Sequence, residues 1–138
     1  RKFQEECLFS HNMYRSRHGA PFLRWSPPLA WAAQQWAEEL VRMGELKHND
    51  DEMVGENLAG MVGDELTGME ATCMWYEEVE DYDFSNPGYS EDTSNFTQVI
   101  WVGSELLGVG RATLGDLCVV VAFYEPPGNM EDFFQKNV

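Results

Sequence analysis

The stretch that decides the fold runs from Ser94 to Trp101 and reads Ser-Asn-Phe-Thr-Gln-Val-Ile-Trp. Two other segments belong with it: residues 55–58 read Gly-Glu-Asn-Leu, and residues 75–78 read Trp-Tyr-Glu-Glu. Each segment sets polar side chains among apolar ones, and Glu56, Glu78 and Asn95 are three of these polar residues. A polar group among apolar neighbours needs a hydrogen-bonding partner or a function. These three residues are therefore the first candidates for a site.

In these three segments the chain resembles the CAP superfamily, which comprises cysteine-rich secretory proteins, antigen 5 and plant pathogenesis-related type 1 proteins. The family signature reads roughly Gly-His-Phe-Thr-Gln-Val-Val-Trp, so Asn95 stands where the family has a histidine. The resemblance implies a central cleft lined by two histidines and two glutamates. The other three positions of this tetrad match His48, Glu56 and Glu78. The cleft is thus expected to be degenerate at Asn95.

The resemblance covers nearly the whole chain. It includes His11-Asn12 and Arg15 near the start, and Tyr124–Asn129, which is similar to a second family signature. Five motifs in the family's order identify residues 1–138 as a single CAP domain. The low cysteine content is most similar to the Golgi-associated pathogenesis-related branch of the family. The resemblance implies a three-layer α-β-α sandwich.

Hydrophobic periodicity independently predicts helices in the first half of the chain. Apolar residues at helical spacing predict a first helix that ends near Gly19. Ser26, followed by two prolines, is a typical helix start, and Gly44 is a typical stop. The stripe expected to face the core between them consists of Leu29, Ala32, Ala33, Trp36, Leu40 and Met43. This pattern predicts a second helix packed on one side of the domain.

The second half of the chain predicts a further helical segment and a β-hairpin. Residues 66–82 have helical spacing, with Glu78 on the apolar face, and residues 83–93 form a long loop. Residues 107–113 and 117–124 are two β-like runs around a Leu-Gly-Asp turn, and the second is apolar enough to be a central strand. Residues 47–56 are polar and are expected to form a loop that carries His48 and Glu56. Together these elements predict an α+β domain with a small, mainly antiparallel central sheet.

Composition and charge limit the partners. Hydrophobic residues make up 43% of the chain, which indicates a folded domain, and no apolar run approaches the ~20 residues of a membrane-spanning helix. The net charge of −15 disfavours nucleic acid and anionic membranes. We therefore expect a protein partner or a small lipid ligand. A homodimer is a further alternative.

The three cysteines bear on the cellular compartment. Cys7, Cys73 and Cys118 are odd in number and widely spaced, whereas disulfide scaffolds are cysteine-dense and usually even-numbered. The sequence thus predicts no disulfides and an intracellular location, cytoplasmic or peripheral to Golgi membranes. Secretion after removal of a signal peptide is the alternative.

The expected cleft has a limited capacity for metal. A pair of histidines can bind Zn²⁺ through neutral imidazole nitrogens, but Asn95 offers only an amide oxygen in place of the second one. His48 is then the one metal-ligand candidate, and zinc binding is expected to be weak. Otherwise Glu56 and Glu78 would serve a hydrogen-bond network with His48, Asn95 and backbone amides.

These observations favour a non-catalytic binding or interaction domain over an enzyme. No serine lies in a Gly-x-Ser-x-Gly context or beside a matched base. His48 with either glutamate is a conceivable acid–base pair, so a metal-dependent or His/Glu-dependent hydrolase remains an alternative. The resemblance implies a second alternative, a carrier of sterols or fatty acids.

Overall fold

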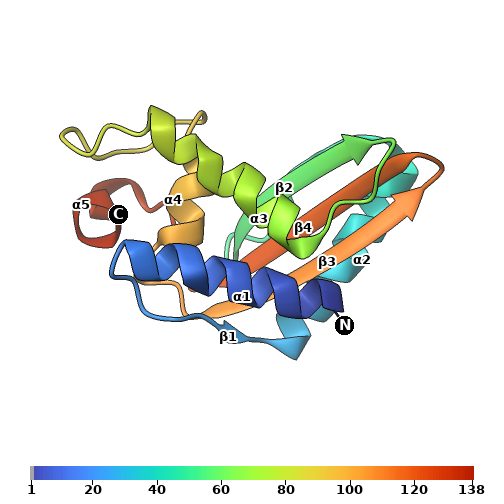
Figure 1. The fold of residues 1–138 in the computed structure, drawn as a ribbon, viewed down its shortest axis with the longest axis horizontal. Helices are drawn as coiled ribbons and strands as arrows, with labels where there is room; N and C mark the ends of the chain where they lie inside the picture. Colours follow the sequence, from blue (N-terminus) through green and yellow to red (C-terminus); the bar gives the residue numbers. More distant parts are fainter. Residues whose placement is uncertain (1) are drawn as a thin grey trace.

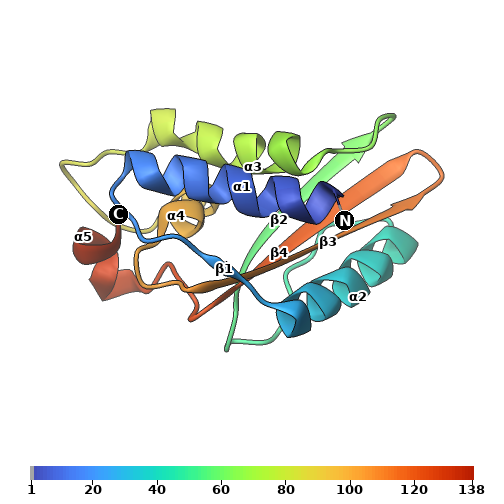
Figure 2. The same cartoon turned by 60° about the horizontal axis from the view of Figure 1, so that its bottom comes forward.

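The structure, a computed structural model, describes residues 2–138 and has three layers. Its elements are α1 (Lys2–Arg17), β1 (Arg24–Trp25), α2 (Pro27–Met43), β2 (Gly55–Val62), α3 (Gly68–Tyr76), η1 (Glu77–Asp81), α4 (Ser94–Ile100), β3 (Leu106–Leu114), β4 (Leu117–Glu125), η2 (Glu131–Phe133) and α5 (Phe134–Asn137). Helix α2 covers one face of the sheet, and α1, α3 and α4 cover the other (Figures 1 and 2). The predicted α-β-α sandwich is confirmed.

The sheet is built around the predicted hairpin. Its strand order is β1-β3-β4-β2, with β1 parallel to β3 and the other pairs antiparallel. Residues 118–124 of β4 are all buried, as expected for a central strand with helices on both faces. Gly115, with φ of +62°, forms the hairpin turn in a backbone region that favours glycine.

Helix α2 has the predicted ends but a different buried face. The Ser26 hydroxyl accepts a hydrogen bond from the Leu29 N–H at 3.3 Å, and Gly44 ends the helix with φ of +72°. The predicted stripe is wrong at Met43, which is 42% exposed, while Ala37 is fully buried. Gly108 and Gly110 of β3 let the α2 backbone at residues 29–34 approach the sheet closely, because a Cβ at either glycine would lie within 2.7 Å of that backbone.

Three further predictions need correction. Glu56 does not lie in a loop but is the second residue of β2, a strand that the glycines at both of its ends concealed. Residues 66–82 do not form one helix, because α3 ends at Tyr76 and continues as the 3-10 helix η1. The chain near residue 24, for which no strand was predicted, adds the short strand β1 to the sheet.

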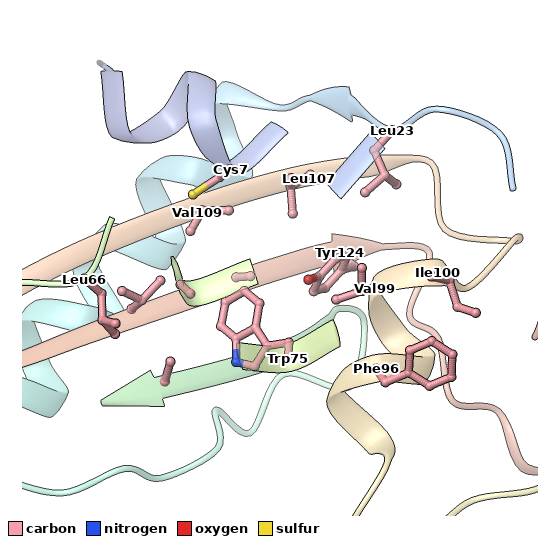
Figure 3. Close-up of a cluster of buried hydrophobic side chains, with 14 of the residues drawn as sticks. Cys7, Leu23, Leu66, Trp75, Phe96, Val99, Ile100, Leu107, Val109 and Tyr124 are labelled. Carbon is pink, nitrogen blue, oxygen red and sulfur yellow. The ribbon is translucent and has the colours of Figure 1, made fainter. Parts of the chain in front are cut away.

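A hydrophobic cluster fills the space between the sheet and helices α1, α3 and α4 (Figure 3). Trp75 of α3, Phe96 of α4 and Tyr124 of β4 are its large aromatic members, each no more than 2% exposed. The Trp75 indole N–H donates to the Leu58 carbonyl oxygen of β2 at 2.9 Å. This contact fastens α3 to the sheet close to the residues from which the sequence predicted a site.

Candidate functional site

Glu78 and Asn95 form the first of two carboxylate-centred pairs. One carboxylate oxygen of Glu78 accepts from the backbone N–H groups of Asn95 and Phe96, at 2.9 and 3.0 Å. The other accepts from the Asn95 side-chain amide at 2.9 Å. Thr93, the N-cap residue of α4, makes no side-chain cap bond, so Glu78 supplies the acceptor that this helix end requires. The inward orientation predicted for Glu78 thus has a structural explanation.

His48 and Glu56 form the second pair. The imidazole Nδ1 of His48 lies 2.8 Å from Glu56 Oε1, which also accepts from the Asn49 backbone N–H at 2.8 Å. The two side chains differ in environment, since that of His48 is 72% exposed and that of Glu56 only 7%. Burial raises the pKa of Glu56, and its hydrogen bonds with Asn49 and His48 oppose that rise. Glu56 Oε2 is buried and has no partner within residues 2–138.

Asn57 connects the two pairs. Its side-chain amide donates to the Asn95 carbonyl oxygen at 3.0 Å, while its neighbour in β2, Glu56, belongs to the other pair. The four predicted residues therefore lie as two pairs on either side of Asn57, which sequence analysis missed. The Gly-Glu-Asn-Leu segment contained the signal, because a strand that begins at Gly55 sends neighbouring polar side chains to opposite faces.

The network continues from Asn57 into the core. The Asn57 amide also donates to the Tyr124 hydroxyl at 3.2 Å, and that hydroxyl lies 2.6 Å from Nε2 of His11. His11 Nδ1 lies 2.8 Å from the Cys7 carbonyl oxygen, which can only accept. Nδ1 therefore carries the proton and Nε2 accepts from Tyr124. His11 is thus buried in the core with a defined tautomer.

Folding stability should depend on pH through His11. Burial lowers its pKa from 6.5 to about 4, so between these values the unfolded chain binds a proton that the folded chain does not. Stability is then lost as the pH falls through this window, by at most about 1.4 kcal/mol per pH unit. In urea unfolding at pH 7, 6 and 5, the free energy of unfolding of the unmodified chain should exceed that of His11→Gln by a smaller margin at each lower pH.

Comparison with this variant isolates His11 from Glu56, whose raised pKa acts in the opposite direction. Equal pH slopes for the two proteins would contradict the assignment.

Within the described part of the chain, residues 2–138, no three His, Cys, Asp or Glu side chains are grouped so that they could hold an ion. Glu78 is fully engaged with α4, and His48 is the one imidazole of the pairs. Cys7, Cys73 and Cys118 are free thiols, which confirms the prediction of no disulfides.

Known proteins resemble this chain over almost its full length. A model of the cysteine-rich secretory protein family, CAP, matches residues 8–124. The chain is 40% identical to human Golgi-associated plant pathogenesis-related protein 1, covering 100% of this chain and 93% of that one. It is 36% identical to protein PRY2 of Saccharomyces cerevisiae, covering 99% of this chain but only 41% of PRY2.

Solved structures agree with the sequence comparisons. Venom allergen-like protein 4 of Schistosoma mansoni superposes with a TM-score of 0.79 at 25% identity, covering 100% of this chain and 96% of that chain.

None of the helices between residues 2 and 138 combines the length and the apolar character needed to cross a bilayer.

Proposed function

The chain belongs to the CAP family, and we propose that it is a non-catalytic binding domain whose cleft contacts a protein partner. The observation that carries this proposal is the engagement of Glu78. Its two oxygens accept three hydrogen bonds from the start of α4, at 2.9 to 3.0 Å. A carboxylate held in this way stabilises a helix end and is not available as a general base or as a metal ligand.

The other pair lacks the arrangement that hydrolysis needs. In the described residues, Glu56 is the one hydrogen-bond partner of His48, so no serine, threonine or cysteine bonds to its ring. An imidazole activates a nucleophile only from hydrogen-bonding distance. A hydrolase remains the competing proposal, and turnover of a peptide substrate that His48→Ala abolishes would establish it.

The His48–Glu56 pair is suited to a ligand that donates hydrogen bonds. Glu56 Oε2 is a buried acceptor without a donor, and the exposed His48 ring lies beside the same carboxylate. An unpaired buried acceptor is costly, and a donor group from a partner would remove that cost. The net charge of −15 favours a cationic group in this role. A homodimer that presents such a group from a second copy remains a proposal.

Zinc binding provides the sharpest test of the degenerate cleft. Calorimetric titration with Zn²⁺ should show weak or undetectable binding to the unmodified chain. Asn95→His should gain affinity, by about tenfold or more, because it adds a second neutral imidazole. A tenfold gain corresponds to about 1.4 kcal/mol.

Two control variants make this test specific. Asn95→Gln keeps an amide and should gain nothing, and adding His48→Ala to Asn95→His should remove the gain. Tight zinc binding by the unmodified chain would overturn the proposal that the cleft is degenerate, whereas the hydrolase question is decided separately by turnover.

One observation favours the lipid-carrier alternative. A groove of about 450 Å³ runs along α3 between Tyr14 of α1 and Met61 of β2, and Leu66, Met69 and Met74 contribute to its lining. Such a lining suits an acyl chain or a sterol. Native mass spectrometry of the purified chain that detects a fatty acid or sterol would support this function in place of the protein partner.

We also propose that the chain works inside the cell, because Cys7 and Cys118 are buried free thiols and Cys73 is a partly buried one. Relatives bear both Golgi-associated and secreted names, so secretion remains the alternative location.

A further inference from the structure

Strand β2 borders the sheet, and its outer edge faces away from β4 (Figure 1). Two contacts define which backbone groups point outward. The Gly63 N–H donates to the Asp116 carbonyl oxygen at 2.8 Å, on the side of β2 that faces β4. The Leu58 carbonyl oxygen accepts a hydrogen bond from the Trp75 indole N–H at 2.9 Å, on the opposite side of the strand. In an antiparallel pair the backbone N–H and C=O groups of successive residues point alternately toward the neighbouring strand and away from it. The backbone groups of odd-numbered residues of β2 therefore bond to β4, and those of even-numbered residues face outward.

The outward groups differ between the two halves of the strand. Near Leu58 the edge is covered by α3, through Trp75. Beyond it, the N–H and C=O groups of Gly60 and Val62 have no partner outside the strand within residues 2–138. The Val62 side chain is 71% exposed. The second half of β2 is thus an open edge that can pair with another strand.

Apolar grooves lie on both sides of this open edge. On the α2 side, Leu46, Val62 and Val119 contribute to a groove of about 250 Å³. On the α3 side, Met61 and Met74 contribute to the groove of about 450 Å³. A strand added to β2 would direct alternate side chains into these two grooves.

Acidic side chains surround the same edge. Glu45 lines the α2-side groove, and Glu70 and Glu77 line the α3-side groove. Asp64 and Glu65 follow directly after the strand, and all five side chains are exposed. Of the basic groups near this edge, Arg111 is engaged with Glu65 at 3.6 Å and with the Leu66 carbonyl at 2.7 Å, and Arg17 lies over the Tyr14 ring at 5.2 Å. The edge therefore presents negative charge beside apolar grooves.

We propose that residues 59–62 of β2 bind an extended basic peptide segment of a partner by strand addition. The main-chain groups of Gly60 and Val62 supply the hydrogen bonds, the grooves take apolar side chains, and the acidic border selects lysine or arginine. A second copy of the chain is a poor occupant, because two chains with a net charge of −15 repel each other. Val62 lies six residues from Glu56, roughly 20 Å along the strand, so this site is distinct from the cleft.

Three labelled peptides test the proposal on the unmodified chain. The first, acetyl-Lys-Lys-Val-Val-Lys-Lys-amide, presents an apolar residue between two lysines on each face of a strand. The second carries N-methyl groups on both valines and keeps the charge, and the third has glutamate in place of lysine. In fluorescence anisotropy titrations the first should bind at least about tenfold more tightly than the other two, because only it combines free N–H donors with positive charge.

Variants at Val62 test the location. Val62→Pro removes an outward N–H and leaves the ladder with β4 intact, so it should fold and bind the first peptide about fivefold or more weakly. Val62→Thr keeps the N–H and should bind as the unmodified chain does.

The proposal would be overturned if the unmodified chain bound the first and the methylated peptide equally tightly. It would also be overturned if folded Val62→Pro bound the first peptide as tightly as the unmodified chain does. Either result would show that charge alone attracts the peptide. Should Val62→Pro not fold, the comparison of methylated and unmethylated peptides decides. Sedimentation that reveals a dimer abolished by Val62→Pro would instead assign the edge to a second copy and likewise overturn it. None of these outcomes changes the zinc result that tests the cleft.

Discussion

Replacing Arg15 with methionine should lower the free energy of unfolding by about 4 kcal/mol. The Arg15 side chain is fully buried, and its guanidinium donates four hydrogen bonds to carbonyl oxygens. These belong to Pro21 at 2.7 Å, Val99 and Trp101 at 2.9 Å, and Ser104 at 3.1 Å. Burial lowers its pKa only to about 10, so the group stays charged at neutral pH. Methionine fills the space but leaves these buried acceptors without donors.

Urea unfolding monitored by circular dichroism at pH 7 measures this effect. Arg42→Met is a suitable control, because that side chain is 62% exposed and bonds to Glu39 on the surface. It should change stability by less than about 0.5 kcal/mol. A loss below about 1 kcal/mol for Arg15→Met would show that the carbonyl groups find water when the guanidinium is removed.

Replacing Gly110 with valine should be at least as damaging, with a loss above about 3 kcal/mol or failure to fold. A Cβ atom at Gly110 would lie 2.7 Å from the Ala33 carbonyl carbon of α2 and closer still to Gln34 backbone atoms. Gly108 meets Leu29 and Ala30 in the same way. Backbone atoms of a helix cannot turn aside as a side chain can, so α2 would have to move off the sheet.

The matched control for this substitution is Gly88→Ala. No atom lies within 4 Å of a Cβ at Gly88, which also has an ordinary φ. The free energy of unfolding of this variant should therefore lie within about 0.5 kcal/mol of that of the unmodified chain. Gly110→Ala should give an intermediate melting temperature, and a fully stable Gly110→Val would contradict the packing of α2 against β3.

Sequence analysis succeeded where local chemistry and tertiary structure agree. The ends of α2 follow from a capping serine and a left-handed glycine, and the central position of β4 follows from its unbroken apolar run. It failed at β2, because a strand rich in glycine that holds Glu56 and Asn57 resembles a loop when its neighbours in the sheet are unknown. The predicted stripe of α2 missed the buried Ala37 and included the exposed Met43, because helical spacing alone does not show which face the sheet covers.

The candidate site divides in the same way. The inward position of Glu78 followed from the apolar periodicity around it, and the resemblance supplied its companions His48, Glu56 and Asn95. The two pairs join residues 8 and 17 positions apart, the bridge through Asn57 spans 38 positions, and the unpaired Glu56 Oε2 depends on burial. No local pattern contains that information.

The hydrogen bonds of Glu78 bear on how this domain can change over evolutionary time. Two of the three come from backbone N–H groups of residues 95 and 96, which almost any side chain at position 95 would still provide. The helix end is thus secured by the main chain, and the side chain at 95 is left free to vary. Histidine and asparagine become interchangeable for the architecture while differing in chemistry, so a lineage can lose or regain a ligand at this position and keep the same scaffold.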